Sequence, residues 1–272
     1  MAIADPIDEA RLRKALLRDD SPWADLRVVD EAGSTNLDLI AHAHGGAPSG
    51  SVLIANFQSA GRGRRGRTWS ALSGTGAAVS VLLHPVDVVP ARWGWLPLVA
   101  GLGVAEGLRQ YPGVPASLKW PNDVLIGDGK VAGILAERID TPRGSAVVVG
   151  FGVNVHLTAA DLPVPSATSL ALHVAESALP GPLSRTEVVR SCLDVLGALY
   201  LAWRTGEQDE ELAASYRKRC ATIDRRVRVE LVGGRPVEGT ATGVDGGGRL
   251  VIRTDSGVQV LSAGDVIHLR GV

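Results

Sequence analysis

The 272-residue sequence contains two cysteines, one methionine and four lysines, and its formal net charge is only −1. Two lone cysteines, Cys192 and Cys220, make neither a disulfide framework nor a zinc site. A net charge near zero gives no global field to attract nucleic acid or an anionic membrane, so positive charge can act only locally. We therefore expect neither nucleic acid nor a membrane as a partner.

The sequence also lacks a long apolar run and a secretory leader. Its longest apolar run, residues 93–104, is interrupted by Gly94 and Pro97 and is too short to span a bilayer. Residues 1–17 carry acidic side chains and have no apolar signal region, so we expect a cytoplasmic protein. Hydrophobic residues make up 45% of the sequence, which is enough for one large domain or for a large and a small one.

Hydrophobic periodicity predicts strands alternating with helices up to about residue 221. The strands are expected at 26–30, 51–56, 77–84, 118–126, 130–139 and 145–155, and the helices at 8–18, 37–44, 92–110, 188–203 and 208–219. After Cys220 the pattern changes to five short strands, at 227–232, 237–244, 249–254, 258–262 and 265–270, separated by glycine-rich turns. Such a pattern suggests a small SH3-like barrel, so we divide the chain into residues 1–221 and 222–272.

The segment AGRGRRGRTW, residues 60–69, concentrates positive charge directly after an apolar strand. Its G-x-G-x-x-G pattern could mark a dinucleotide-binding turn, but that turn must lead into a helix, and residues 67–76 show no helical pattern. A basic nucleic-acid patch and a merely solvated loop are further interpretations. The fourth is an anion-binding loop, in which glycines admit a ligand close to the backbone and arginines donate to its phosphate or carboxylate. Such a loop would be mobile when empty, because its charges repel one another, and a bound anion would order it.

Two more motifs each allow a structural and a functional interpretation. Residues 33–36, GSTN, could cap a helix or bind a small polar head group beyond the cap. In residues 119–124, KWPNDV, Pro121 keeps Trp120 out of the helical region, which predicts an extended strand broken by a fixed turn. Asn122 and Asp123 could cap this turn or hold a metal-bound phosphate.

The glycine-bearing strands allow the same two interpretations. In residues 130–137, alternation puts Lys130 on one face with Ala132, Ile134 and Ala136, either as a strand-edge cation or as a buried ligand contact. Arginine is the usual cation of this chain, so a retained lysine hints that a compact ammonium is needed there. In residues 150–155, GFGVNV, two glycines imply close packing, and Asn154 carries both the donor and the acceptor that an adenine edge requires.

Taken together in this order, GSTN, FQSAGRGRRGRTW, KWPNDV, GKVAGILAE and GFGVNV closely resemble the biotin protein ligases. The motifs cover about residues 28–156, and the small β domain extends the resemblance to the end of the chain. The resemblance implies an α/β (α+β) catalytic domain with a mixed β-sheet flanked by helices. It also implies ATP-dependent biotinylation of a lysine on a biotin carboxyl carrier domain through biotinyl-5′-AMP, with biotin, ATP and Mg²⁺. A lipoate or octanoate ligase or transferase of related fold is the alternative.

The resemblance also assigns site residues. Biotin binding falls to Ser34, Thr35, Asn36, Gln58, Arg62, Gly63, Arg64 and Lys130; ATP binding to Arg64, Trp69, Asn122 and Asn154; catalysis to Arg62, Arg64 and Lys130; and Mg²⁺ to Asp123. Short hydrogen-bonding side chains suit the biotin urea, because each unpaired group in a dry pocket would cost about 1–3 kcal/mol. GSTN begins at Gly33, too early for a preceding winged-helix domain, so we expect a ligase without repressor function. The sequence leaves open whether the protein is a monomer or a homodimer.

Overall fold

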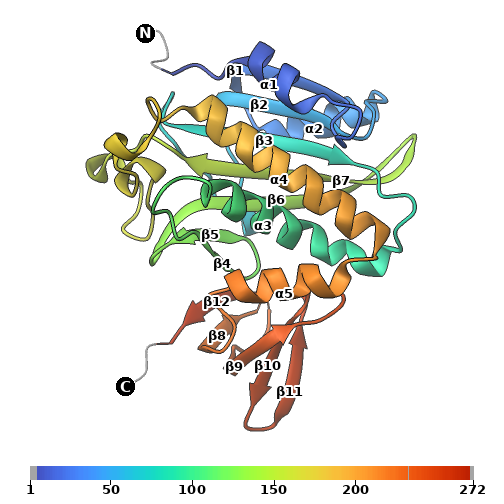
Figure 1. Ribbon diagram of the computed structural model, residues 1–272. Coiled ribbons are helices and arrows are strands. Elements are labelled where there is room, and N and C mark those ends of the chain that lie inside the picture. The colour runs from blue at the N-terminus through green and yellow to red at the C-terminus, as the bar shows by residue number, and fades with distance from the viewer. Residues whose placement is uncertain (1–4, 232, 270–272) are drawn as a thin grey trace.

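Two β-sheets organise the chain in the computed structural model, which describes residues 5–231 and 233–269 (Figure 1). The larger sheet has the strand order β1-β2-β3-β7-β6-β5-β4, with β1 parallel to β2 and the other neighbours antiparallel. Its strands are β1 (Asp25–Ala32), β2 (Ser51–Gln58), β3 (Gly76–Leu83), β4 (Ser117–Lys119), β5 (Asp123–Ile126), β6 (Gly129–Thr141) and β7 (Gly144–Asn154). The predicted mixed sheet is thereby confirmed.

Helices cover both faces of the larger sheet. On one face lie α1 (Glu9–Leu16), α3 (Leu96–Leu108) and α4 (Arg185–Thr205); α3 contacts strands β4 to β7, and α4 packs against α3 and contacts β3 (Figure 1). Close packing of these two helices requires small residues, because a Cβ at Gly103 would lie 2.8 Å from Leu196 Cα. The opposite face carries α2 (Thr35–His44), whose Leu39 and Ala43 pack on Leu53 and Leu82. α5 (Asp209–Arg219) lies near the end of the sheet, above the second sheet.

Alternation along the central strands makes one face of the sheet bulky and the other hollow. In β7, Val149, Phe151 and Val153 enter the core shared with α3 and α4, whereas Gly150 and Gly152 face the other way. Ser80 of β3 pairs with Gly150, and Gly133 of β6 pairs with Gly152. Because these neighbours are small, the sheet leaves open space beside the N-terminal end of α2.

The second sheet is antiparallel, with the order β11-β10-β9-β8-β12, which confirms its five predicted strands. They are β8 (Arg226–Glu230), β9 (Val237–Val244), β10 (Leu250–Thr254), β11 (Gly257–Leu261) and β12 (Asp265–His268). Trp120 Nε1 donates to Gly248 O at 3.2 Å and Trp95 Nε1 to Asp245 O at 3.1 Å, joining this sheet to the rest of the chain. Val232 and Arg270, the predicted ends of two of these strands, lie outside the described residues.

Three expectations about local structure need correction or comment. The strand expected at 118–126, broken by a turn at Pro121, is a hairpin of β4 and β5: the turn is present as predicted, and it also reverses the chain. The apolar helix expected at 92–110 begins as a 3₁₀ segment, since Pro97 removes an N–H that an α-helix would use. Residues 1–4, part of the segment that we expect not to be a secretory leader, lie outside the described residues.

The 3₁₀ helices of the described chain are η1 (Arg64–Gly66), η2 (Pro90–Trp95), η3 (Ala159–Asp161), η4 (Leu170–Leu172) and η5 (Glu176–Ala178).

In the described part of the chain, no helix combines the length and the apolar character needed to cross a bilayer. Cys192 and Cys220 are both buried and free. Burial raises the pKa of the Cys192 thiol to about 12, so the thiol stays protonated and inert at neutral pH.

Candidate active site

A pocket opens on the hollow face of the larger sheet, beside the N-terminus of α2. Its volume is about 670 Å³, counting the space open to solvent at its mouth. Ten of the predicted site residues line it: Ser34, Thr35, Asn36, Gln58, Arg62, Gly63, Arg64, Trp69, Asn122 and Lys130. The other two, Asp123 and Asn154, are not among its lining residues. Residues separated by almost a hundred positions in the sequence therefore converge on one cavity.

The GSTN segment supplies one end of this pocket. Ser34 occupies the N-cap position of α2, but its side chain makes no capping hydrogen bond. Ser34, Thr35 and Asn36 are only 3–4% exposed, although they are polar. The side chains therefore serve the pocket rather than the helix end.

Ser80 connects these side chains into a hydrogen-bonded chain. Its Oγ lies 2.8 Å from Thr35 Oγ1 and 2.7 Å from Asn36 Oδ1. The Asn36 oxygen can only accept, so the single Ser80 proton belongs on that bond, and the Thr35 hydroxyl has one proton to donate either to Ser80 or to Gln58 Oε1. Gln58 Oε1 accepts from the Thr35 N–H at 2.8 Å and lies 3.1 Å from its hydroxyl. The pocket thus contains a fixed, oriented set of donors and acceptors.

Glu137 joins the same network from β6. It accepts from Asn36 Nδ2 at 2.8 Å, which fixes the orientation of that amide, and pairs with Arg62 Nη1 at 3.0 Å. Arg62 is therefore tied to the polar end of the pocket through a carboxylate, and its charge is balanced there.

Arg64 of the loop also lines the pocket, where it contacts Asn122. Its Nη1 donates to Asn122 Oδ1 at 3.1 Å, and Asn122 is itself fixed by bonds to Ile134, from Nδ2 to O at 3.0 Å and from the Ile134 N–H at 2.8 Å. Burial lowers the pKa of the Arg64 guanidinium, and the positive charges of Arg65 and Arg67 add to this effect. An anion placed beside Arg64 would relieve this destabilisation of its charge.

The remaining loop arginines pair with the second sheet. Arg65 Nη1 and Arg67 Nη2 bind the two oxygens of Asp265, at 3.0 and 2.9 Å, and Arg65 Nη2 also donates to Glu230 O at 3.0 Å. The expectation of a mobile loop rested on unbalanced repulsion between its arginines. That premise was wrong, because Asp265 lies opposite two of them. Nor does an α-helix follow the glycines, since η1 leads into an extended segment, which removes the basis for a dinucleotide-binding turn.

Trp69 lies flat against the glycine-bearing strands. A Cβ at Gly152 would lie 2.3 Å from Trp69 Nε1, and one at Gly133 would lie 3.2 Å from its Cζ3. The Lys130 ammonium lies 5.5 Å from the centroid of the indole, within cation–π range. Glycines at these positions are therefore required for the aromatic wall of the pocket.

Lys130 does not share a face with Ala132 and Ile134, contrary to the alternation expected from the sequence. The β5–β6 ladder pairs Leu125 with Lys130 but Val124 with Ala132, so β6 contains an extra residue at this point. Ile134 consequently packs in the core, whereas Lys130 Nζ would lie 3.1 Å from a Cβ at Gly133, on the pocket face. The irregularity thus turns the lysine into the site.

Asp123 and Asn154 stand at the edge of this arrangement. Asp123 Oδ1 lies 2.6 Å from Lys130 Nζ. Asn154 is 3% exposed; its Nδ2 donates to Thr168 O at 2.9 Å, while its Oδ1 has no hydrogen-bond partner in the described part of the chain. No cluster of three His, Cys, Asp or Glu side chains suited to a metal occurs among the described residues. One carboxylate suits Mg²⁺ nevertheless, because that ion is commonly held by one or two carboxylates together with substrate phosphates.

Three residues important to this site were missed from the sequence. Ser80 is a lone polar residue in the apolar strand AAVSVLL, and Glu137 ends the quoted motif GKVAGILAE, so both left a visible signal. Asp265 left none, because it lies about 200 residues from the arginines that it binds.

Comparison with known proteins agrees with this geometry. Residues 33–154 match the Biotin/lipoate A/B protein ligase family, and residues 222–269 match the Biotin protein ligase C terminal domain. The chain is 44% identical to the biotin–[acetyl-CoA-carboxylase] ligase of Mycobacterium tuberculosis, covering 97% of each chain. It is 29% identical to the bifunctional ligase/repressor BirA of Bacillus subtilis, covering 87% of this chain and 72% of that protein.

Among solved structures, the biotin protein ligase of Aquifex aeolicus in complex with biotin and ATP superposes with a TM-score of 0.74 at 27% identity, covering 92% of this chain and 100% of that one. The near full-length similarity to the M. tuberculosis enzyme and the two matched segments point to the same family. The chain belongs to the biotin/lipoate A/B protein ligase family, and within it to the biotin protein ligases.

Proposed function

We propose that this protein joins biotin to ATP and then transfers the biotinyl group to a lysine of a biotin carboxyl carrier domain. The observation that carries the proposal is the convergence of GSTN, the arginine loop, Trp69 and Lys130 on one pocket. In the first step a biotin carboxylate oxygen attacks the α-phosphorus of ATP and pyrophosphate leaves. In the second, the amine of the carrier lysine attacks the acyl carbon and AMP leaves.

The biotin urea belongs at the end formed by Ser34, Thr35 and Asn36. A urea offers two N–H donors and one carbonyl acceptor, and these match a network whose orientations are fixed by Ser80 and Gln58. Gly150 and Gly152 let Asn36 and Trp69 lie close to the sheet, and the apolar bicycle would occupy the pocket beside these two side chains. Because these polar groups are already oriented, few hydrogen bonds must be rearranged when biotin enters, and this favours binding.

The anionic groups belong at the other end, beside Arg64 and Lys130, while the catalytic role of Arg62, which is paired with Glu137 at the polar end, stays a prediction. Two anions must meet in the first step, and fixed cations reduce their repulsion and stabilise charge that grows on the α-phosphate. Trp69 offers a flat wall for adenine next to the phosphate-binding side chains. The free acceptor of Asn154 suits an exocyclic amine such as that of adenine, so its role in base recognition stays a prediction.

Mg²⁺ fits this scheme as a companion of ATP. Asp123 would supply its carboxylate, with Asn122 nearby, and the ion would neutralise phosphate charge when bound. The protein's own contribution is then to orient the two reactants and to exclude water from the mixed anhydride.

We further infer the domain division, the protein partner and the cellular location. The chain divides near residue 222 into a catalytic unit and an SH3-like C-terminal domain. The protein that it biotinylates is the biotin carboxyl carrier domain of a carboxylase, and the reaction takes place in the cytoplasm. The ion pairs of Asp265 support a role for the C-terminal domain in holding the arginine loop. We expect no nucleic acid or membrane partner, while either a monomer or a homodimer is compatible with this function.

The test is biotin-dependent exchange between ATP and radioactive pyrophosphate. Exchange is expected with biotin, and lipoate and octanoate should not support it. Exchange with lipoate alone would instead establish the related lipoate ligase activity. No exchange with any of the three acids would contradict the proposal.

A further inference from the structure

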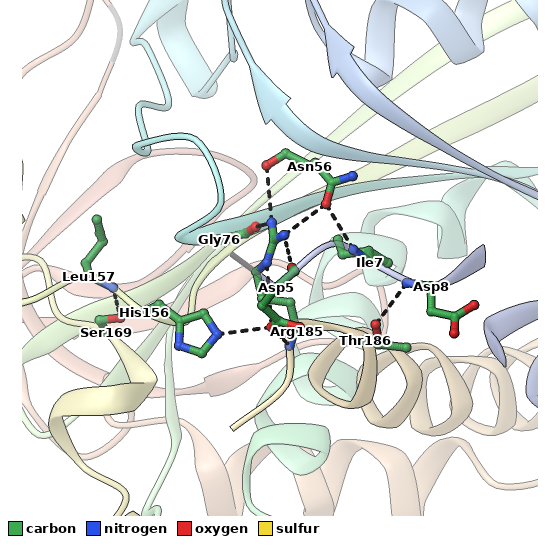
Figure 2. A network of polar contacts seen from close by, with 10 residues as sticks. All are labelled: Asp5, Ile7, Asp8, Asn56, Gly76, His156, Leu157, Ser169, Arg185 and Thr186. Atoms are coloured by element: carbon green, nitrogen blue, oxygen red, sulfur yellow. Dashed lines mark hydrogen bonds and ion pairs between the residues drawn. The ribbon is translucent and has the colours of Figure 1, made fainter. Parts of the chain in front are cut away.

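One fully buried charge lies outside the pocket. Arg185, drawn in Figure 2, is the first residue of α4. Its side chain is 0% exposed. Burial lowers the pKa of its guanidinium, and only Asp5 partly offsets this effect. Burying a charge costs free energy unless hydrogen bonds compensate, so the partners of the Arg185 guanidinium indicate its role.

Three of the guanidinium's hydrogen bonds go to the two ends of the arginine loop. Arg185 Nη1 donates to Gly76 O at 2.9 Å and to Asn56 O at 3.4 Å, and Nη2 donates to Asn56 Oδ1 at 3.0 Å (Figure 2). Asn56 lies near the end of β2, where the loop begins, and Gly76 is the first residue of β3, where the loop ends. One guanidinium therefore joins the roots of residues 59–75.

The two strands separate at this point. The β2–β3 ladder pairs residues only up to Ala55 and Ala78, so the backbone oxygens beyond it need other donors. The planar guanidinium presents several N–H groups in a fixed geometry, which sets the spacing between the two roots. A flexible lysine could not fix both roots in this way.

The roots lead directly to the site. Gln58, two residues after Asn56, binds Thr35, and Ala78, two residues after Gly76, pairs with Gly152 beneath Trp69. A hollow of about 280 Å³, counting its open side, lies between the roots and Trp69.

We propose that Arg185 is a positioning residue that holds both roots of the 59–75 loop, and through them Gln58 and Trp69, in the geometry needed to form and retain the adenylate. The proposal rests on the proposed function for the nature of the intermediate. The anchoring itself concerns only contacts within this chain.

Arg185 also contacts the N-terminal segment, which offers a purely structural explanation. Asp5 Oδ2 accepts from the Arg185 N–H at 2.7 Å and lies 3.1 Å from His156 Nε2, and Nη2 also donates to Asp5 O. Thr186 makes a comparable contact without touching the loop, because its Oγ1 accepts from the Asp8 N–H at 3.0 Å. Thr186→Val is therefore a matched control that loosens the same segment from the same helix end.

The experiment compares the full chain with Arg185→Met, Arg185→Lys and Thr186→Val. Hydrogen–deuterium exchange reports the loop without any substrate, and the release rate of biotinyl-5′-AMP and the KM for ATP report the site. We expect both Arg185 variants to speed exchange in residues 59–75 and to release adenylate about tenfold faster, as loss of charged hydrogen bonds implies. Transfer from bound adenylate to the carrier should keep its rate.

Thr186→Val should speed exchange only near residues 5–8 and leave adenylate release unchanged. The proposal is overturned if the Arg185 variants leave loop exchange and adenylate release at parental values. It is equally overturned if Thr186→Val, at the same loss of melting temperature, produces the same changes. Failure of the parent to catalyse biotin-dependent exchange would contradict the proposed function instead, while loop exchange would still decide the anchoring.

Discussion

Lys130 Nζ lies 2.6 Å from Asp123 Oδ1, so the lysine assigned to catalysis and the carboxylate assigned to Mg²⁺ form an ion pair. The pair spans the β5–β6 hairpin beside the irregularity that turns Lys130 toward the pocket. Asp123 thereby holds the ammonium of a lysine that lines the pocket. A phosphate-bound Mg²⁺ would compete with Lys130 for this carboxylate, which would leave the ammonium for substrate.

Lys130→Ala should therefore slow adenylate formation by about 10²–10³-fold, the usual effect of losing one group that stabilises developing charge. Lys130→Arg should not restore the rate, because Nζ already lies 3.1 Å from the Cβ position of Gly133 and a guanidinium needs more space. Pre-steady-state measurement of adenylate checks this. Lys119→Ala, a lysine that does not line the pocket, is the control. Near-parental adenylate formation in Lys130→Ala would show that another cation acts.

Gly152→Ala should weaken ATP binding by displacing Trp69. The added methyl would lie 2.3 Å from the indole nitrogen, so the ring must leave the strand. We expect the KM for ATP to rise about tenfold or more, since aromatic stacking on a base contributes about 1–3 kcal/mol. Gly243→Ala, where a Cβ meets nothing within 4 Å, should keep the parental KM. Equal KM values in the two variants would show that Trp69 does not bind the nucleotide.

Asp265→Asn should loosen the arginine loop from the C-terminal sheet. It removes the carboxylate shared by Arg65 and Arg67, and the freed charges would then repel one another and Arg64. Adenylate release should become several-fold faster with little loss of stability, because both pairs are partly exposed. Glu238→Gln, which removes an exposed pair with Arg228 from the same sheet, is the control. Identical release rates in both variants would mean that the loop is held by other contacts.

His268 should make the protein less stable below neutral pH. Burial, together with the charges of Lys119 and Arg225, lowers the pKa of His268 to about 4 from the ordinary 6.5. As pH falls, the unfolded chain binds the proton first, so the free energy of unfolding decreases between pH 6.5 and pH 4. Urea unfolding across this range should show a shallower decrease for His268→Gln than for the parent. His42→Gln, at an exposed histidine, should keep the parental dependence of unfolding free energy on pH. A slope in His268→Gln equal to that of the parent would contradict this explanation.

Much of the fold followed from local pattern. Period-two and helical repeats located the strands and helices, because burial of one face imposes those periods wherever an element packs on the core. Pro97 and the Trp120–Pro121 turn shifted the helix start and split a strand, since backbone restrictions at proline override apolar periodicity. Each predicted site residue belongs to a short motif that allows more than one interpretation by itself. The order of these motifs along the chain is what indicates the family.

The sequence by itself determined which chemistry is available: a cationic, glycine-rich loop, a polar GSTN turn, an isolated lysine and close-packing glycines. Only the tertiary structure decided how these groups meet. The extra residue in β6 turned Lys130 toward the pocket, Asp265 balanced two loop arginines across about 200 residues, and Arg185 joined the two ends of the loop. Each of these depends on contacts between distant segments, which form when strands pair and helices pack, and no local pattern of residues encodes them.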